Sequence, residues 1–268
     1  MESRNKIIIG VIIIIVVICI GYAAFSGAFS GSANSNDQTV DLAAAASLKN
    51  VYDDKLIPMF EEKYPGITVK GTYASSGDLQ TQIENGLETD VFMSASNKQM
   101  NALAEKGIID NSTVKKSVQN KLVLIVPSDS TTNVTSFEGL KDVNGTIAIG
   151  DPESVPAGQY AKESLTNLGV WDSVQSKLSL GTSVTAVLNQ VADGSAEYGI
   201  VYTTDAKSND KVKVIAEAPE DSLDKPIVYP IGMIKNAKDA DGAQKFMEFL
   251  QSKEAQDVLR DYGFTVVN

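Results

Sequence analysis

Ser47, Ser76 and Ala157 stand at three points where an apolar run gives way to a helical pattern. Ala157 follows Pro156 within the stretch GDPESVPAGQYAKESL (150–165), and proline is well placed in the first turn of a helix. The first main-chain N–H groups of a helix have no partner inside it and lie at the positive end of its dipole. Each of these helix starts is therefore suited to bind an anion.

A fourth helical pattern begins at Val184, and Tyr202 ends the apolar run 199–201. A hydroxyl group at the carboxyl end of a strand faces the edge of the sheet where ligands bind in α/β proteins. Each of these residues also has an ordinary structural interpretation. A serine commonly caps a helix, a valine packs in a core, and a buried tyrosine makes a structural hydrogen bond.

Taken together, the five residues would supply only neutral hydrogen-bond donors: two serine hydroxyls, a phenol, and the main-chain N–H groups of Ala157 and Val184. Such a set, aimed at one point, predicts a site for a fully deprotonated tetrahedral dianion. Hydrogen bonds to a charged group contribute about 1.5–3 kcal/mol each, so about half a dozen would offset much of the cost of dehydrating the ion. The set needs no carboxylate acceptor, which disfavours a ligand that still carries a proton.

The chain has no histidine, and its one cysteine is Cys19. Serine–histidine–aspartate triads, cysteine–histidine pairs and histidine-based zinc sites are therefore excluded. Residues 37–268 carry a net charge of −12, from 21 basic and 33 acidic residues, which argues against a nucleic-acid partner. This charge does not prevent binding of a small anion, because salt screens distant charges beyond about 8–10 Å.

The elements that would position these donors alternate along the chain. Apolar or alternating runs predict strands at 40–44, 67–73, 90–95, 122–127, 147–150, 198–202, 212–216 and 229–234. Helical patterns follow at 47–60, from 77 to about 85, and at 98–106, 156–168, 184–192, 240–250 and 254–262. This alternation predicts an α/β fold with parallel-rich sheets and helices on both faces.

Residues 1–36 have the pattern of an export segment. Arg4 and Lys6 precede an apolar run from Ile7 to Ile20, which is typical of a signal peptide or a signal anchor. The length of the apolar run favours an uncleaved anchor, followed by a flexible tether over 26–36, although small residues after it would permit cleavage. Ile18 before Cys19 is bulkier than lipid-attachment processing usually accepts. We therefore expect an extracytoplasmic protein.

Six segments of the chain resemble the periplasmic molybdate-binding proteins of ABC transporters. In order, they are AAAASLKN (43–50), YASSGDLQ (73–80), TDVFMSAS (89–96), GDPESVPAGQYAKESL (150–165), GIVYTTDA (199–206) and RDYGFTVV (260–267). The resemblance implies the two-lobed periplasmic binding protein fold of type II, each lobe a mostly parallel sheet flanked by helices. It implies that 37–120 and 229–268 form lobe 1 and that 121–228 form lobe 2.

The resemblance also implies a ligand and partners. Molybdate, and tungstate of nearly the same size, would be held between the lobes by Ser47, Ser76, Ala157, Val184 and Tyr202, with no direct protein ligand to molybdenum, no cofactor and no catalytic residue. Gly77 follows Ser76 where the family has a run of serines, so Ser75 is a candidate to share that role, and the match around Val184 is looser. A membrane permease and its ATPase are the implied partners of a monomer.

Other interpretations remain open. The ligand could instead be sulfate, phosphate or a small organic anion. A hydrolase would need a lysine base or paired carboxylates, and the chain has no GxSxG or GxxxxGK[ST] motif. Possible glycosylation sequons at Asn111, Asn133 and Asn144 would suit a surface interaction protein. A related branch of oxyanion binders completes a six-coordinate metal centre with carboxylates, but we interpret Asp151 and Glu153 as loop-solvating and capping groups.

Overall fold

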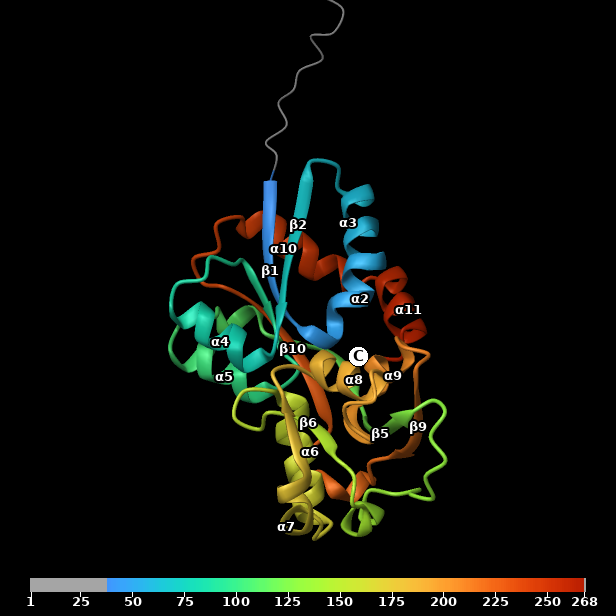
Figure 1. Cartoon of the computed structure of the whole chain (residues 1–268). Coiled ribbons are helices and arrows are strands. Elements are labelled where there is room, and N and C mark those ends of the chain that lie inside the picture. Colours follow the sequence, from blue (N-terminus) through green and yellow to red (C-terminus); the bar gives the residue numbers. More distant parts are fainter. Residues whose placement is uncertain (1–37, 268) are drawn as a thin grey trace, which may run out of the picture. The chain divides into compact units, whose positions relative to one another are not determined.

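Two mixed β-sheets flanked by helices make up residues 38–267, which the computed structural model describes (Figure 1). The first sheet has the strand order β11-β4-β10-β3-β1-β2, with β1 (Gln38–Ala45), β2 (Ile67–Ala74), β3 (Val91–Met93), β4 (Lys115–Asn120), β10 (Ile227–Met233) and β11 (Thr265–Val266). The second has the order β7-β6-β8-β5-β9, with β5 (Leu122–Pro127), β6 (Ile147–Gly150), β7 (Leu178–Gly181), β8 (Tyr198–Tyr202) and β9 (Val212–Glu217).

Helices connect most of the strands. They are α2 (Lys49–Val51), α3 (Ile57–Lys63), α4 (Ser76–Glu84), α5 (Asn97–Glu105), α6 (Pro156–Asn167), α7 (Trp171–Val174), α8 (Val184–Ala192), α9 (Thr203–Lys207), α10 (Ala240–Phe249) and α11 (Lys253–Asp261). A π turn, η2 (Tyr52–Leu56), joins α2 and α3 into one helical segment, and a 3₁₀ turn, η1 (Ala46–Leu48), precedes α2 directly. Further 3₁₀ turns are η3 (Asn111–Thr113), η4 (Glu138–Asp142), η5 (Gln175–Lys177) and η6 (Glu220–Ser222).

All the strands expected from the sequence are present, and the α/β two-lobed fold class is confirmed. We refer to the first sheet with its helices as lobe 1 and to the second as lobe 2. The chain crosses between them twice, through Lys121 between β4 and β5 and again between β9 and β10. The lobe limits at 120/121 and 228/229 remain a prediction.

The expectation of mostly parallel sheets was wrong. In lobe 1, β1 pairs in parallel with β2 and β3, but β10 is antiparallel to both β3 and β4. In lobe 2, β6 pairs in parallel with β7 and β8, while β5 is antiparallel to β8 and β9. A strand–helix–strand crossover makes neighbouring strands parallel. β5 and β10 enter their sheets from the other lobe, so no such crossover sets their direction.

The central strands of lobe 1, β1, β3 and β10, are buried on both faces. Leu42 and Ala44 of β1 face the core on the side of α3 and α10, whereas Ala43 belongs to a separate cluster with Leu79 of α4 and Met100 of α5 (Figure 1). Burial on both faces explains why the second half of β1, residues 42–45, appears in the sequence as a continuous apolar run rather than an alternating one.

In lobe 2, two glycines allow α6 to begin directly against the end of β6. A Cβ atom on Gly158 would overlap the carbonyl oxygen of Gly150, and a Cβ on Gly150 would meet Cγ1 of Val155 at 2.5 Å. The close approach of helix and strand therefore requires glycine at both positions. These are the glycines of the stretch GDPESVPAGQYAKESL, and they position the start of α6 for the site described below.

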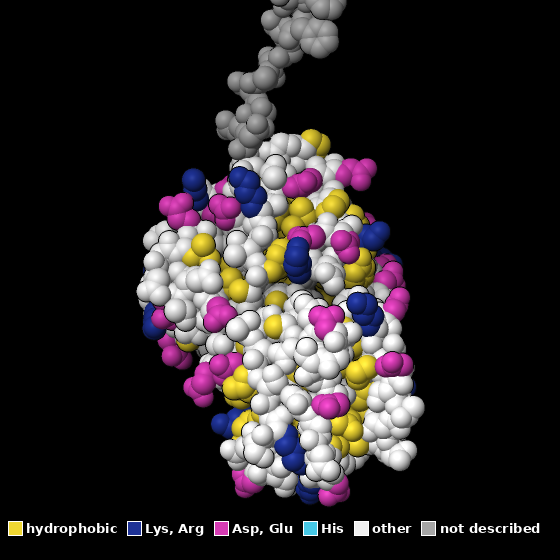
Figure 2. Space-filling view, viewed as in Figure 1, with side chains coloured by type: hydrophobic (Ala, Val, Ile, Leu, Met, Phe, Trp, Pro, Cys, Tyr) yellow, Lys and Arg dark blue, Asp and Glu magenta, His cyan; other side chains and the backbone are white. Residues whose placement is uncertain are grey.

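The N-terminal export or anchor segment predicted from the sequence lies outside the described residues. Within 38–267, the structure contains no helix that is both long enough and apolar enough to cross a membrane. Figure 2 shows basic side chains scattered singly among acidic ones on the face in view.

Candidate functional site

The structure brings all five predicted site residues to one small pocket. The pocket lies where the carboxyl ends of strands meet the starts of η1, α4, α6 and α8. Its lining comprises Ala45, Ala46, Ser47, Ala74, Ser75, Ser76, Ala95, Val155, Pro156, Ala157, Val184 and Tyr202. Both lobes contribute, since η1 and α4 belong to lobe 1 and α6 and α8 to lobe 2.

Main-chain donors enter the pocket from lobe 2. The N-cap of α6 is Val155, whose side chain makes no capping bond, and Pro156 follows in the first turn. Ser183 caps α8 by accepting from the N–H of Ala186 at 3.1 Å. Within the described part of the chain, the main-chain N–H groups of Ala157 and Val184 have no acceptor, as expected for the first turn of a helix. Two donors at positive helix ends therefore remain available to an anion.

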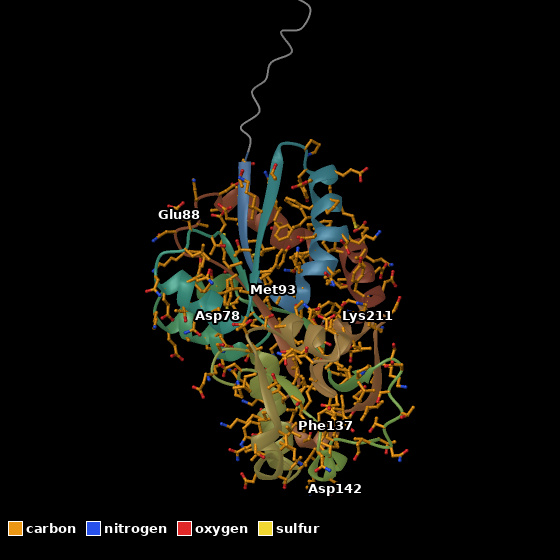
Figure 3. All side chains as sticks on the ribbon, in the orientation of Figure 1. Asp78, Glu88, Met93, Phe137, Asp142 and Lys211 are labelled. Carbon is orange, nitrogen blue, oxygen red and sulfur yellow. The ribbon has the colours of Figure 1, made fainter. Side chains whose placement is uncertain are left out.

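Neither predicted serine is a helix cap, in contrast to their ordinary structural interpretation. The side chain that caps α4 is Ser75, whose Oγ accepts from the main-chain N–H of Asp78 at 3.0 Å (Asp78 is labelled in Figure 3). The Oγ of Ser76, which is fully buried, accepts instead from the N–H of Ala95 at 3.0 Å. Because that bond occupies the serine oxygen as an acceptor, the Ser76 proton is free to be donated into the pocket.

Ser47 lies within η1, whose N-cap is Ala45. Its Oγ is 2.9 Å from the hydroxyl oxygen of Tyr229 in β10. Tyr229 is fully buried and also accepts from Nδ2 of Asn120 at 3.4 Å. Tyr229 and Asn120 are neighbours of the site that sequence reasoning missed, because each belongs to a strand and has no local motif that links it to residue 47.

Tyr202 is the most unusual member of the set. Its side chain is 1 % exposed, and its hydroxyl has no hydrogen-bond partner among residues 38–267. Burial raises the pKa of Tyr202 well above its ordinary value, so the group remains a protonated donor. An unpaired buried hydroxyl lowers the stability of the folded protein by about 1–3 kcal/mol. A ligand in the pocket would remove this cost by accepting a hydrogen bond from it.

The chemistry of the pocket lining is uniform. The described residues that line it are apolar or neutral and include no charged side chain. Asp151 and Glu153 do not line it: Oδ1 of Asp151 accepts from the N–H of Glu153 at 3.0 Å in the loop before α6. Within residues 38–267, no group of three or more His, Cys, Asp or Glu side chains is arranged to hold a metal ion.

Contacts between the two lobes close the pocket. The N–H of Gly77 in α4 donates to the carbonyl oxygen of Ser154 at 2.9 Å. Nearby, Nε2 of Gln99 in α5 donates to Oε1 of Gln159 in α6 at 3.4 Å. The buried Asp205 of α9 lines a neighbouring pocket together with Ser47. Burial raises the pKa of Asp205 to about 7.

Comparison with known proteins supports this description. The family model described as bacterial extracellular solute-binding protein matches residues 40–265. The molybdate-binding protein ModA of Haemophilus influenzae is 40 % identical over 230 residues, covering 84 % of this chain and 89 % of ModA. A putative ABC transporter substrate-binding lipoprotein of Bacillus subtilis, YvgL, is 41 % identical over 227 residues, covering 85 % and 86 %. The solved periplasmic molybdate-binding protein of Azotobacter vinelandii superposes with a TM-score of 0.76 at 22 % identity, covering 85 % and 100 %.

Proposed function

The chain belongs to the family of bacterial extracellular solute-binding proteins, and on that premise we propose that it binds molybdate as the extracytoplasmic component of an ABC importer. The observation that carries the proposal is the convergence of five neutral donors on one pocket, including a buried tyrosine hydroxyl with no partner among residues 38–267. The 40 % identity to a protein named for molybdate binding supports the same ligand.

The proposed ligand set consists of the hydroxyls of Ser47, Ser76 and Tyr202 and the main-chain N–H groups of Ala157 and Val184. All five groups donate, so the set suits an ion that offers only acceptors. Preorganised donors in a site without water are stronger than the same donors in water, because the local dielectric constant is low. Tungstate is expected to bind as well, since it is nearly the same size. Sulfate, which is smaller, would contact fewer of the donors at once.

The proposed mechanism is closure of the two lobes around the ion. In an open form, lobe 1 would present the two serines and lobe 2 would present the two N–H groups and Tyr202. Closure would bring the two half-sites together and form the contact between Gly77 and Ser154. The ion favours the closed form only through its higher affinity for that form. The closed form would then deliver the ion to a membrane permease, and the ATPase subunit would drive import.

We further propose that residues 1–36 export the protein and hold it at the outer face of the cell membrane. The basic residues Arg4 and Lys6 and the apolar run after them support this role. No catalytic role is proposed, because the relatives are solute-binding proteins rather than enzymes.

Isothermal titration calorimetry of residues 37–268 with molybdate, tungstate, sulfate and phosphate tests the proposed ligand. We expect tight 1:1 binding of molybdate and tungstate, and much weaker binding of the other two ions. Sulfate bound as tightly as molybdate would contradict the molybdate assignment and leave only a general anion-binding role.

A further inference from the structure

We propose that Tyr229 is a positioning residue for Ser47: it occupies the oxygen of Ser47 as an acceptor, so the serine proton is directed to the bound anion. This inference rests on the proposed function, because it assigns Tyr229 a part in the same oxyanion site. Tyr229 does not line the pocket itself and would act only through Ser47.

The direction of the hydrogen bond between Tyr229 and Ser47 follows from the number of donors around Tyr229. The two hydroxyl oxygens are 2.9 Å apart, and either group could donate. Nδ2 of Asn120 donates to the Tyr229 oxygen at 3.4 Å, so Tyr229 already acts as an acceptor. Among the described residues, the acceptor within reach of the Tyr229 proton is Oγ of Ser47. Tyr229 therefore donates to Ser47, and the proton of Ser47 remains for another acceptor.

The environment of Tyr229 keeps it in this role. The side chain is fully buried, and its ring packs edge-on against Tyr202, with centroids 5.8 Å apart, and against Phe264, with centroids 5.7 Å apart. Burial raises the pKa of Tyr229, so its hydroxyl stays protonated and can donate. The ring is thus held by packing, and the hydroxyl alone acts on Ser47.

Asn120 extends this arrangement to the connection between the lobes. It is the last residue of β4, and only Lys121 separates it from β5 in lobe 2. Its Nδ2 atom also donates to Oγ1 of Thr204 in α9 at 2.9 Å, and its Oδ1 accepts from the N–H of Lys121 at 2.9 Å. Both hydrogens and the oxygen of the amide are therefore used. The amide of Asn120 is fixed in orientation, and it in turn fixes Tyr229.

Ser76 provides a second example of the same principle in lobe 1. Its oxygen accepts from the main-chain N–H of Ala95, which also leaves its proton free. In both serines of the site, the oxygen accepts a hydrogen bond and the proton is left to be donated to the ion. A main-chain N–H orients Ser76, whereas a side chain orients Ser47. Only the orientation of Ser47 can be removed by a point substitution that leaves the serine in place.

The test is the affinity for molybdate of the full-length protein and of its Tyr229→Phe variant, measured by calorimetry in detergent. The variant keeps the ring and its packing, so it is expected to fold. Without the phenol donor the Ser47 hydroxyl can rotate away from the ion, and we expect affinity to fall roughly five- to tenfold, the equivalent of one hydrogen bond. Tyr52→Phe is the matched control, because Tyr52 is also fully buried but donates to Sδ of Met93, labelled in Figure 3. This control is expected to leave affinity unchanged.

A double-mutant cycle separates positioning from a general structural effect. In a Ser47→Ala background, Tyr229→Phe should cause no further loss of affinity, whereas in a Ser76→Ala background it should cause its full loss. An equal loss in both backgrounds would overturn the inference. So would unchanged affinity of Tyr229→Phe in a protein that loses affinity with Ser47→Ala. If the unmodified protein does not bind molybdate, the proposed function itself is overturned, which is a separate result.

Discussion

The main-chain N–H of Gly77 donates to the carbonyl oxygen of Ser154 at 2.9 Å, which joins the start of α4 in lobe 1 to the loop before α6 in lobe 2. A Cβ atom on Gly77 would overlap the Ser154 carbonyl. Glycine at this position therefore allows the backbones of the two lobes to touch beside the pocket.

Gly77→Ala should weaken molybdate binding without unfolding either lobe. Alanine fits the helical backbone at this position, but its methyl group would hold Ser154 away and oppose closure. We expect at least a tenfold loss of affinity by calorimetry, with a midpoint of thermal unfolding close to that of the unmodified protein in the absence of ligand. Gln82→Ala on the exposed side of α4 is the control. Equal affinities of the two variants would show that closure does not depend on this contact.

Tyr202→Phe should change affinity and stability in opposite directions. Loss of one donor to a charged ligand is expected to reduce affinity about 10- to 100-fold, while removal of an unpaired buried hydroxyl should raise the free energy of unfolding of the ligand-free protein by about 1 kcal/mol. Calorimetry and urea unfolding measure the two effects. Tyr198→Phe on the same strand is the control, because its hydroxyl is paired with Thr132 at 2.8 Å. A ligand-free Tyr202→Phe protein that is less stable would contradict the prediction.

Ser76→Ala should lower both ligand affinity and stability, whereas Ser75→Ala should lower stability alone. Ser76→Ala removes a proposed donor and leaves the N–H of Ala95 buried without its acceptor, so both affinity and stability should fall. Ser75→Ala removes the cap of α4 and should lower the free energy of unfolding by about 1 kcal/mol, with little effect on affinity. A large loss of affinity in Ser75→Ala would instead assign part of the donor role to Ser75.

Asp205 should make stability depend on pH. Burial raises the pKa of its carboxyl from 3.8 to about 7, so between these values the folded protein holds a proton that the unfolded chain has released. The free energy of unfolding therefore falls as pH rises through this window, by up to about 1.4 kcal/mol per pH unit, and levels off above it. Asp205→Asn, which is neutral throughout, should remove this contribution. Urea unfolding of the unmodified protein and of Asp205→Asn at pH 5 and pH 8 measures this contribution. If the free energy of unfolding changes between the two pH values by the same amount in both proteins, the prediction is refuted.

The sequence alone was enough to predict the order and type of most elements. Continuous apolar runs such as 42–45 and 147–149 become buried strands, because a strand covered on both faces needs apolar side chains in both directions. The strands that were not predicted are short or polar. β4 is KKSVQN, which has a single apolar residue, and β7 is LSLG, which has only two apolar residues and is too short for a clear strand pattern.

The donor types at the site were also evident in the sequence, because helix starts and strand ends are local features. The absence of histidine determined which chemistry those donors could not perform. Their convergence on one pocket was implied only by a family resemblance and could not be derived from residues spread between positions 47 and 202. The interpretation of Ser76 as a helix cap was one residue away from the true cap of α4, Ser75, because adjacent serines are equivalent in a local pattern but make different hydrogen bonds in the fold.

Only the tertiary structure decided how the site is closed and oriented. Tyr229 meets Ser47 across 182 residues of sequence, and Gly77 meets Ser154 across the two lobes. Strand direction in the mixed sheets was decided in the same way, by chain crossings between the lobes. The physical reason is common to all three. Local pattern records which backbone conformation a segment prefers, whereas a hydrogen bond between distant residues depends on how the complete set of elements packs.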